Sequence, residues 1–267
     1  MKKTTEDNKK EMGLRLLYSF LGVILVILIW EIIHFSTSQS VFPEFFLTLG
    51  KMFGLFSDKN VFIGLGYSIL RIVITLAIVF FLGTLLGLLS AFYPPLEKIM
   101  APLIYIITAL PTASLIFIFI IYTKITCELL VGVLTFPIIY KAVLGGGKII
   151  LGRYRLTVSL DGRYKAKNFF KVLVPLSLPY MSLSLAQASG LALKAEIMGE
   201  VFMSSNRFRG IGVLINSAYL SADTGRLFAL TLLAVLFMSV VELALFFIKR
   251  GLTDKFGIEP TKTFRLI

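Results

Sequence analysis

The sequence predicts an all-α, polytopic membrane protein, and three observations carry that prediction. Hydrophobic residues make up 57% of the 267 residues and charged residues only 16%, a composition that is typical of integral membrane proteins. The apolar residues gather into long stretches, each near the roughly 20 residues that cross a hydrocarbon core of about 30 Å as a helix. Lys and Arg residues gather between and beyond these stretches.

Six spans are predicted in order along the chain. The first, residues 14–34, is too long for the core of a signal peptide and is expected to be a retained span. The other five are residues 61–93, 101–122, 129–151, 178–203 and 227–248. Between the first two spans, the amphipathic residues 44–56 are expected to form a helix. It lies either on the outer membrane surface or against the bundle.

Small residues and prolines add detail to the second, third and fourth spans. Gly83, Gly87 and Ala91 follow one another at intervals of four, so they share a helix face and predict close packing of a neighbouring backbone. Pro111 and Pro137 lie inside the third and fourth predicted spans. Prolines there produce kinks that either open a pathway or only serve packing, and both interpretations stay open.

The basic residues predict how the bundle is oriented. They concentrate in the N-terminal tail, at Lys98, between Lys148 and Lys171, and after Lys249. Because loops rich in Lys and Arg stay in the cytoplasm, six spans with both termini inside fit this distribution, and the net charge of +12 does not indicate nucleic-acid binding. The expected organisation is a cytoplasmic tail (1–13), a membrane domain (14–250) that includes a cytoplasmic coupling segment (153–175), and a second cytoplasmic tail (251–267).

The residue types exclude several kinds of site. The single cysteine, Cys127, cannot form an intramolecular disulfide or a zinc site, and the single histidine, His34, is expected to be an interfacial residue. The chain contains no Gly-rich phosphate loop, no metalloprotease motif and no set of residues for a Ser-His-Asp triad. We therefore expect no catalytic residue, no metal site and no cofactor in this chain, and an energy source on another chain.

The basic segment between the fourth and fifth spans is predicted to form a helix-turn-helix. Its first helix covers residues 153–161 and its second 163–171, with Gly162 at the turn. Pro175 is expected to end the second helix and to redirect the chain towards Pro179, where the fifth span begins. Such an element carries force from a soluble partner to the spans, or else it is a solvated loop that only sets topology.

Motifs in this order resemble a known family. Gly162 is followed, after nine intervening residues, by Val172-x-Val174-Pro175. This pattern resembles the cytoplasmic signature of permease subunits of binding-protein-dependent ABC importers, which is Glu-Ala-Ala, Gly and then Ile-x-Leu-Pro. The chain departs from that signature at Leu156-Thr157-Val158, where Glu-Ala-Ala is expected, and at Val174. Further motifs over residues 41–250 resemble the nitrate, sulfonate, taurine and thiamine-precursor permeases: Ser68-x-x-Arg71 with Gly83-x-x-x-Gly87, Leu110-Pro111-Thr112-Ala113, Phe136-Pro137-Ile138, and Glu200 followed by Gly210-Ile211-Gly212.

The resemblance implies a six-helix, type I importer domain in the bacterial cytoplasmic membrane. Two permease subunits, most simply a homodimer, would form the pathway, and two cytoplasmic ATPases would bind ATP and Mg²⁺. An extracytoplasmic binding protein would deliver the solute. The residues implied to contact the ATPases are Asp161, Gly162, Arg163, Tyr164, Val172, Val174 and Pro175.

Charged residues inside spans are costly in lipid, so they mark a pathway or an ion-pair network. The candidates are Arg71, Lys141, Lys194, Glu196 and Glu200, with Pro111 as a kink that widens the path. Glu196 and Glu200 lie one turn apart and need Arg71, Lys194 or water to relieve their repulsion. An ion-pair network is the favoured interpretation, and cations on the path would suit an anionic or zwitterionic solute. The alternatives are a stand-alone channel or ion-coupled carrier, and a membrane enzyme.

Overall fold

The structure, a computed structural model, describes residues 5–37, 41–122, 125–154, 168–203 and 209–256, and all regular secondary structure in them is helical. The helices are α1 (Thr5–Ser36), α2 (Phe45–Leu55), α3 (Lys59–Phe92), α4 (Pro94–Ala109), α5 (Thr112–Tyr122), α6 (Thr126–Arg153), η1 (Phe169–Leu173), α9 (Val174–Phe202), α10 (Ile211–Leu220) and α11 (Thr224–Phe256). Five helices within the described residues are long and apolar enough to cross a membrane, and a sixth span exists if α4 and α5 count as one. The prediction of an all-α polytopic protein is confirmed.

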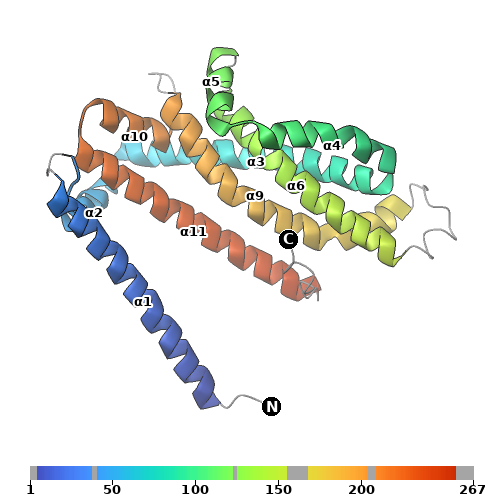
Figure 1. The fold of residues 1–267 in the computed structure, drawn as a ribbon, viewed down its shortest axis with the longest axis horizontal. Helices are drawn as coiled ribbons and strands as arrows, with labels where there is room; N and C mark the ends of the chain where they lie inside the picture. Colours follow the sequence, from blue (N-terminus) through green and yellow to red (C-terminus); the bar gives the residue numbers. More distant parts are fainter. Residues whose placement is uncertain (1–4, 38–40, 123–124, 155–167, 204–208, 257–267) are drawn as a thin grey trace.

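The core is formed by α3, α6 and α9, which run side by side along the long axis of the molecule (Figure 1). Its fully buried residues include Val143 of α6, Leu173 of η1 and Ala192 of α9. At one end of this bundle, α2, α10 and the start of α11 form a second apolar cluster around Leu230, which is fully buried. The core thus joins segments that are far apart in the sequence.

Small residues let α3 and α6 approach closely, as their spacing predicts. A Cβ atom added at Gly83 would lie 2.8 Å from Cγ2 of Ile139, and one at Gly87 would lie 3.0 Å from the carbonyl oxygen of Tyr140. On the facing helix, a Cβ at Gly147 would lie 2.6 Å from Cβ of Ala91. Real Cβ atoms do not approach other atoms to 2.6 or 2.8 Å, and 3.0 Å is unusually close, so a larger residue at any of the three positions would force its neighbour to shift.

Gly147→Ala is therefore expected to lower the stability of the bundle, because Cβ of Ala91 cannot rotate away and the two backbones must separate. Overpacking of this kind costs about 1–3 kcal/mol. Gly145→Ala is the matched control on the same helix, since a Cβ there meets nothing within 4 Å. The test compares thermal unfolding midpoints of the two variants in detergent. Equal midpoints would mean that the α3–α6 contact relaxes without cost.

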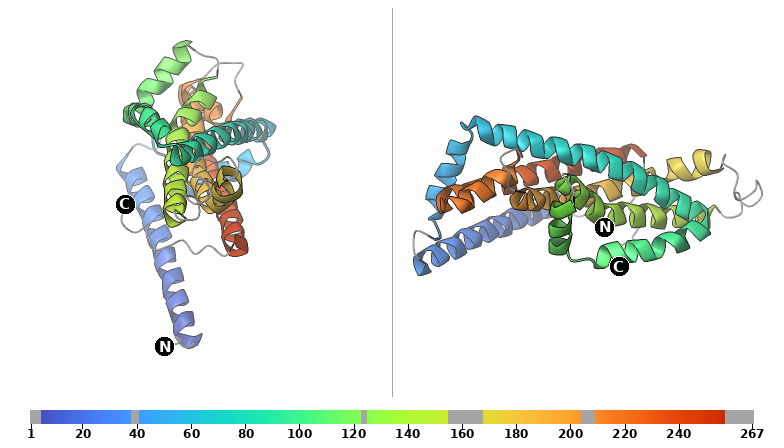
Figure 2. Two further views of the ribbon diagram at one scale, coloured as in Figure 1. Left: turned by 90° about the vertical axis from the view of Figure 1, so that its right-hand side faces the viewer. Right: turned by 90° about the horizontal axis from the view of Figure 1, so that it is seen from above.

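Helix α1 lies apart from this core. None of the residues in its apolar window is buried, and its N-terminal half points away from the bundle (Figures 1 and 2). Its far end is attached to the bundle: Trp30 Nε1 donates a hydrogen bond to the carbonyl of Pro43 (3.0 Å), and the N–H of Phe45 donates to Glu31 Oε1 (3.0 Å). The ring of His34 is hydrogen-bonded through Nδ1 to the carbonyl oxygen of Phe42 (2.8 Å).

The amphipathic stretch before the second span forms a helix, as predicted. This helix, α2, packs against α11 and buries Thr48 and Met52. Of the two placements that the sequence leaves open, packing against the bundle is the one observed.

The third predicted span is not one straight helix, and it counts as a span only if α4 and α5 are taken together. Residues 101–122 contain a bend of 97° between α4 and α5. The cause is local: Pro111 has no N–H to donate to a carbonyl one turn earlier, and its ring pushes Leu110 out of the helical region to φ −70° and ψ 130°. Pro94 and Pro95 then occupy the first turn of α4, where a missing N–H costs nothing.

The predicted break at Pro175 is wrong. Residues 169–173 form a π-helical turn that continues directly into α9, so no redirection towards Pro179 occurs and the helix begins before residue 178. The wider turn is closed by a hydrogen bond from the N–H of Val174 to the carbonyl of Phe169, and it accommodates a proline within the first turn of the following helix. Of the predicted helix-turn-helix, residues 155–167 lie outside the described residues.

Candidate functional site

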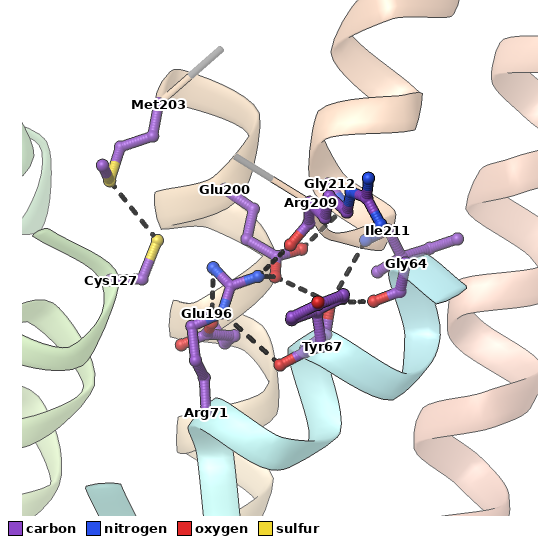
Figure 3. Close-up of polar contacts among 11 residues, drawn as sticks. Gly64, Tyr67, Arg71, Cys127, Glu196, Glu200, Met203, Arg209, Ile211 and Gly212 are labelled. Carbon is purple, nitrogen blue, oxygen red and sulfur yellow. Dashed lines mark hydrogen bonds and ion pairs between the residues drawn. The ribbon is translucent and has the colours of Figure 1, made fainter. Parts of the chain in front are cut away.

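Two glutamates on α9 are the most deeply buried charged residues that the structure describes. Glu196 and Glu200 are both 0% exposed. They lie one helical turn apart and so face the same way, towards α3 and the start of α10 (Figure 3). Two carboxylates held this close repel each other, so the arrangement depends on the groups that surround them.

Arg71 of α3 forms ion pairs with both carboxylates. Its Nη1 lies 3.5 Å from Glu196 Oε1 and its Nη2 lies 3.0 Å from Glu200 Oε1, while the arginine side chain itself is only 13% exposed. The same guanidinium donates to the backbone carbonyl of Tyr67 through Nε (3.4 Å) and to that of Arg209 through Nη2. A planar group with five donors suits this task, because it serves several acceptors from one position.

The start of α10 and Ser68 of α3 supply the remaining partners of Glu200. The N–H of Gly212 donates to Oε2 (2.8 Å), and Ser68 Oγ donates to Oε1 (2.7 Å). The same hydroxyl oxygen accepts a hydrogen bond from the N–H of Ile211 (3.1 Å). The first N–H groups of a helix have no partner within it, and the helix dipole favours a negative charge there, so Glu200 acts as an external cap for α10.

Close approach at this point requires glycine. A Cβ atom at Gly212 would lie 2.6 Å from the carbonyl oxygen of Ile197 and 2.6 Å from Cβ of Glu200. At Gly210, a Cβ would lie 2.2 Å from Glu200 Oε1. The Gly-x-Gly motif therefore exists because the backbone of α10 rests directly on α9.

The resulting network joins three helices, α3, α9 and α10, through one cation and two anions. Glu200 has several hydrogen-bond donors, whereas Glu196 meets the guanidinium only through the longer ion pair. This network holds α3, α9 and α10 together at this end of the bundle. Because a partly compensated network of buried charges depends on each member, removing one of them costs more than a surface ion pair would.

The structure brings together three of the predicted pathway residues and separates the others. Arg71, Glu196 and Glu200 form the network, and of the two cations that the sequence offered as partners, Arg71 is the one in contact. Lys194 lies on the opposite side of α9 and is exposed. Lys141 of α6 is also exposed and lines a cavity of about 260 Å³ with Glu97 and Tyr105.

Pro111 lies at the bend between α4 and α5. Among the residues predicted to contact the ATPases, Asp161, Gly162, Arg163 and Tyr164 lie outside the described residues. Val172 and Val174 are half-buried and Pro175 is exposed at the start of α9. This end of α9 is anchored to α3 by Phe169, whose ring lies 5.5 Å from that of Phe92, and by Leu173, which is fully buried.

One side chain of the site, that of Ser68, was not predicted as a site residue. Ser68 is part of the Ser-x-x-Arg motif, and its place three residues before Arg71 puts both side chains on one helix face, so a signal was present. Glu128 lines a separate cavity of about 530 Å³ between α3, α4 and α6. Within the described part of the chain, no group of three His, Cys, Asp or Glu residues is placed to hold a metal ion.

Comparison with known proteins gives a family for this arrangement. The family model described as "binding-protein-dependent transport system inner membrane component" matches residues 83–256, well over half of the chain and most of its helical core. No curated protein matches the sequence. Components of this family have no catalytic site of their own, and their ATPase is a separate subunit. The chain therefore belongs to the binding-protein-dependent transport system inner membrane components: it is a multi-pass permease subunit of an ABC transport system.

Proposed function

We propose that this permease moves a small polar solute with a negative group into the cell, an anion or a zwitterion of the nitrate, sulfonate, taurine or thiamine-precursor kind. The observation that carries the proposal is a pair of exposed lysines at membrane depth, Lys141 and Lys194. Neither makes an ion pair with the acidic side chains of the described residues.

The depth of the two lysines follows from helix geometry. Lys141 lies about 18 Å from the Arg153 end of α6, near the middle of a helix about 42 Å long. Lys194 lies about 12 Å from the Phe202 end of α9. A lysine that faced lipid at such depths would cost at least about 2.5–3.5 kcal/mol. Exposed lysines are therefore best explained by a hydrated surface in the assembled transporter, where they attract a negatively charged group.

The charged network has a different role in this proposal. Arg71 is already bound by Glu196, Glu200 and two backbone carbonyls, so it has little capacity left for a solute. We assign the network to holding α3, α9 and α10 together as the bundle moves. Lys141 and Lys194 are then the side chains that select the charge of the solute.

The assembly that we propose is a homodimer of permeases with both termini in the cytoplasm. The distribution of Lys and Arg supports this orientation. Two ATPases would grip residues 153–175, and ATP binding would draw them together and open the bundle outward. The direct continuity of η1 with α9 and the anchoring of Phe169 on Phe92 support the transmission of force from that segment into the core.

Each part of this assembly has its own test. Two copies carrying different tags should copurify with the ATPase in mild detergent if the permease is a homodimer. A cysteine introduced as Gly162→Cys should be labelled by a membrane-impermeant reagent only in inside-out vesicles, and labelling of intact cells would refute the orientation. Uptake that persists after deletion of residues 155–167 would refute the coupling role.

The solute class is tested with the complete transporter in proteoliposomes. The binding protein encoded beside this chain is first screened by thermal shift against nitrate, ethanesulfonate, taurine and ethylamine, of which ethylamine is the purely cationic comparison. At low concentrations of the solute that it binds, Lys141→Gln and Lys194→Gln are expected to reduce uptake about tenfold each, because a charged hydrogen bond contributes about 1.5–3 kcal/mol.

The matched control is Lys59→Gln, which removes an exposed lysine at the first residue of α3 and should leave uptake unchanged. A binding protein that recognises only ethylamine would contradict the proposal. So would unchanged uptake by both lysine variants at low solute concentrations.

A further inference from the structure

The charged network contains one more buried carboxyl group than its single cation can balance (Figure 3). Arg71 keeps one positive charge at any pH at which the protein is folded, whereas Glu196 and Glu200 carry two negative charges if both are ionised. Both glutamates are 0% exposed, so bulk water does not reach either carboxyl group. One net negative charge would then lie inside the bundle, and a buried charge without a counter-charge is strongly destabilising.

The other cations near this part of α9 do not supply the missing charge. Both ion pairs of the two glutamates among the described residues are with Arg71. Lys194 is exposed on the opposite side of α9. The side chain of Arg209 is also exposed, and its guanidinium lies over the ring of Tyr67, 6.0 Å from the ring centroid. The excess negative charge therefore needs another source of compensation.

The remaining titratable groups that face Glu196 are acidic. On α6, the thiol of Cys127 is fully buried and Glu128 is half-buried, and both interact electrostatically with Glu196. The start of α10 contributes backbone N–H groups and no charged side chain. On α11, Glu242 lies next to Gly190, about 9 Å away along α9. None of these groups can offset a second carboxylate.

The hydrogen bonds show which of the two carboxyl groups lacks donors. Glu200 accepts hydrogen bonds from the N–H of Gly212 (2.8 Å) and from Ser68 Oγ (2.7 Å), and its ion pair with Arg71 is the shorter one. Both oxygens of Glu196 are buried and accept no hydrogen bond from an N–H or O–H group of the described residues. The two carboxyl groups nevertheless lie within hydrogen-bonding reach of each other. Two carboxylates only accept, so a bond between them requires a proton.

We propose that the charged network binds one proton, which Glu196 carries and donates to Glu200. The proton comes from water and forms an O–H bond on Glu196, the carboxyl group that lacks other donors. Glu200 stays ionised, because it has three donors and the closer contact with Arg71. The network is then neutral, and the repulsion between neighbouring carboxylates is replaced by a hydrogen bond. This proton site does not depend on which solute the transporter carries.

Infrared spectroscopy of the complete transporter at neutral pH tests the proposal directly. A protonated carboxyl group absorbs in the carbonyl region, apart from carboxylates, and its band shifts in heavy water. The wild type is expected to show such a band. Glu196→Gln should lose it, and so should Glu200→Gln, because one arginine then balances the one remaining carboxylate. Glu44→Gln removes an exposed carboxylate beside α2 and should keep the band.

The pH dependence of thermal unfolding gives a second test. Unfolding releases Glu196 into water, where it is ionised, so the folded chain binds one more proton than the unfolded chain and its stability falls as the pH rises. From about pH 6 to about pH 9, the wild-type midpoint should fall by roughly 2–4 °C per pH unit more than that of Glu196→Gln. The glutamine keeps the shape and a donor of the protonated side chain but has no proton to release. Cys127→Ala and Glu128→Gln are controls on α6 and should show the wild-type slope.

Four results would overturn the proposal. A carbonyl band that persists in Glu196→Gln would place the proton on another residue. Equal pH slopes for the wild type and Glu196→Gln would show that no proton is bound at this site, and loss of the slope in Cys127→Ala would assign it to the thiol. A loss of stability in Glu196→Gln as large as that in Arg71→Ala would show that the arginine needs an ionised Glu196.

Discussion

Arg71→Ala is expected to cause the largest loss of stability and to abolish ATP-driven uptake. The substitution leaves Glu196 and Glu200 fully buried without their cation, and removing one partner of a buried ion pair costs about 3–5 kcal/mol. It also removes the hydrogen bonds that the guanidinium donates to the carbonyls of Tyr67 and Arg209. The measurement is the thermal unfolding midpoint of the purified transporter, together with uptake in proteoliposomes.

Two variants show whether the charge or the shape of Arg71 matters. Arg71→Lys keeps the charge but cannot serve two carboxylates and two carbonyls at once, so its stability should fall between those of the wild type and Arg71→Ala. Combining Arg71→Ala with Glu196→Gln and Glu200→Gln should restore part of the lost stability, because no buried charge remains uncompensated. Wild-type stability of Arg71→Ala alone would refute the role of the network.

Lys194→Ala provides the matched comparison on the same helix. Lys194 is exposed and lies on the opposite side of α9 from the network, so its removal should leave the unfolding midpoint unchanged while it lowers uptake. If Arg71→Ala lowers the stability and Lys194→Ala lowers only uptake, then the charged network stabilises the bundle and Lys194 belongs to the surface that we propose meets the solute. Identical effects of the two substitutions would contradict this division.

Gly212→Ala is expected to have the second-largest effect. Its new Cβ would lie 2.6 Å from the carbonyl oxygen of Ile197, which belongs to the backbone of α9 and cannot rotate away. Helix α10 must then move outward, and the hydrogen bond from the N–H of Gly212 to Glu200 (2.8 Å) is lost. The overpacking costs about 1–3 kcal/mol and the charged hydrogen bond about 1.5–3 kcal/mol.

Gly66→Ala is the control for this change. A Cβ at Gly66 meets nothing within 4 Å, and alanine is the better helix former, so this variant should be as stable as the wild type or slightly more stable. Both variants are compared by thermal unfolding and by proteolysis near α10. If Gly212→Ala unfolds at the wild-type temperature, then α10 does not rest on α9 as tightly as the distances require.

The predictions of spans and the predictions of proline kinks differ in accuracy for a physical reason. Spans depend on local composition, so the second, fourth and fifth lie within a few residues of α3, α6 and α9. Kinks depend on what surrounds a proline. Pro111 breaks the third span outright, whereas Pro175 and Pro179 lie in a continuous helix because a π-helical turn accommodates the chain before them.

The charged site shows the same limit. The intervals between Glu196 and Glu200, and between Ser68 and Arg71, placed each pair on one helix face without any structure. No interval within a helix could show that Arg71 rather than Lys194 meets the glutamates, because that choice depends on how α3 packs against α9. Nor could it show that Glu128 lines an apolar cavity, since the walls of that cavity come from three helices.

The sequence by itself determined that this chain is a helical membrane protein with basic segments between its spans, because hydropathy and helix length act within each segment. Its ordered motifs also indicated the family that the comparison confirmed. Tertiary structure alone decided which charges meet, where the third span bends in space and which glycines touch a neighbouring backbone. Those features depend on contacts between residues far apart in the chain, such as Ser68 and Glu200, which no local pattern encodes.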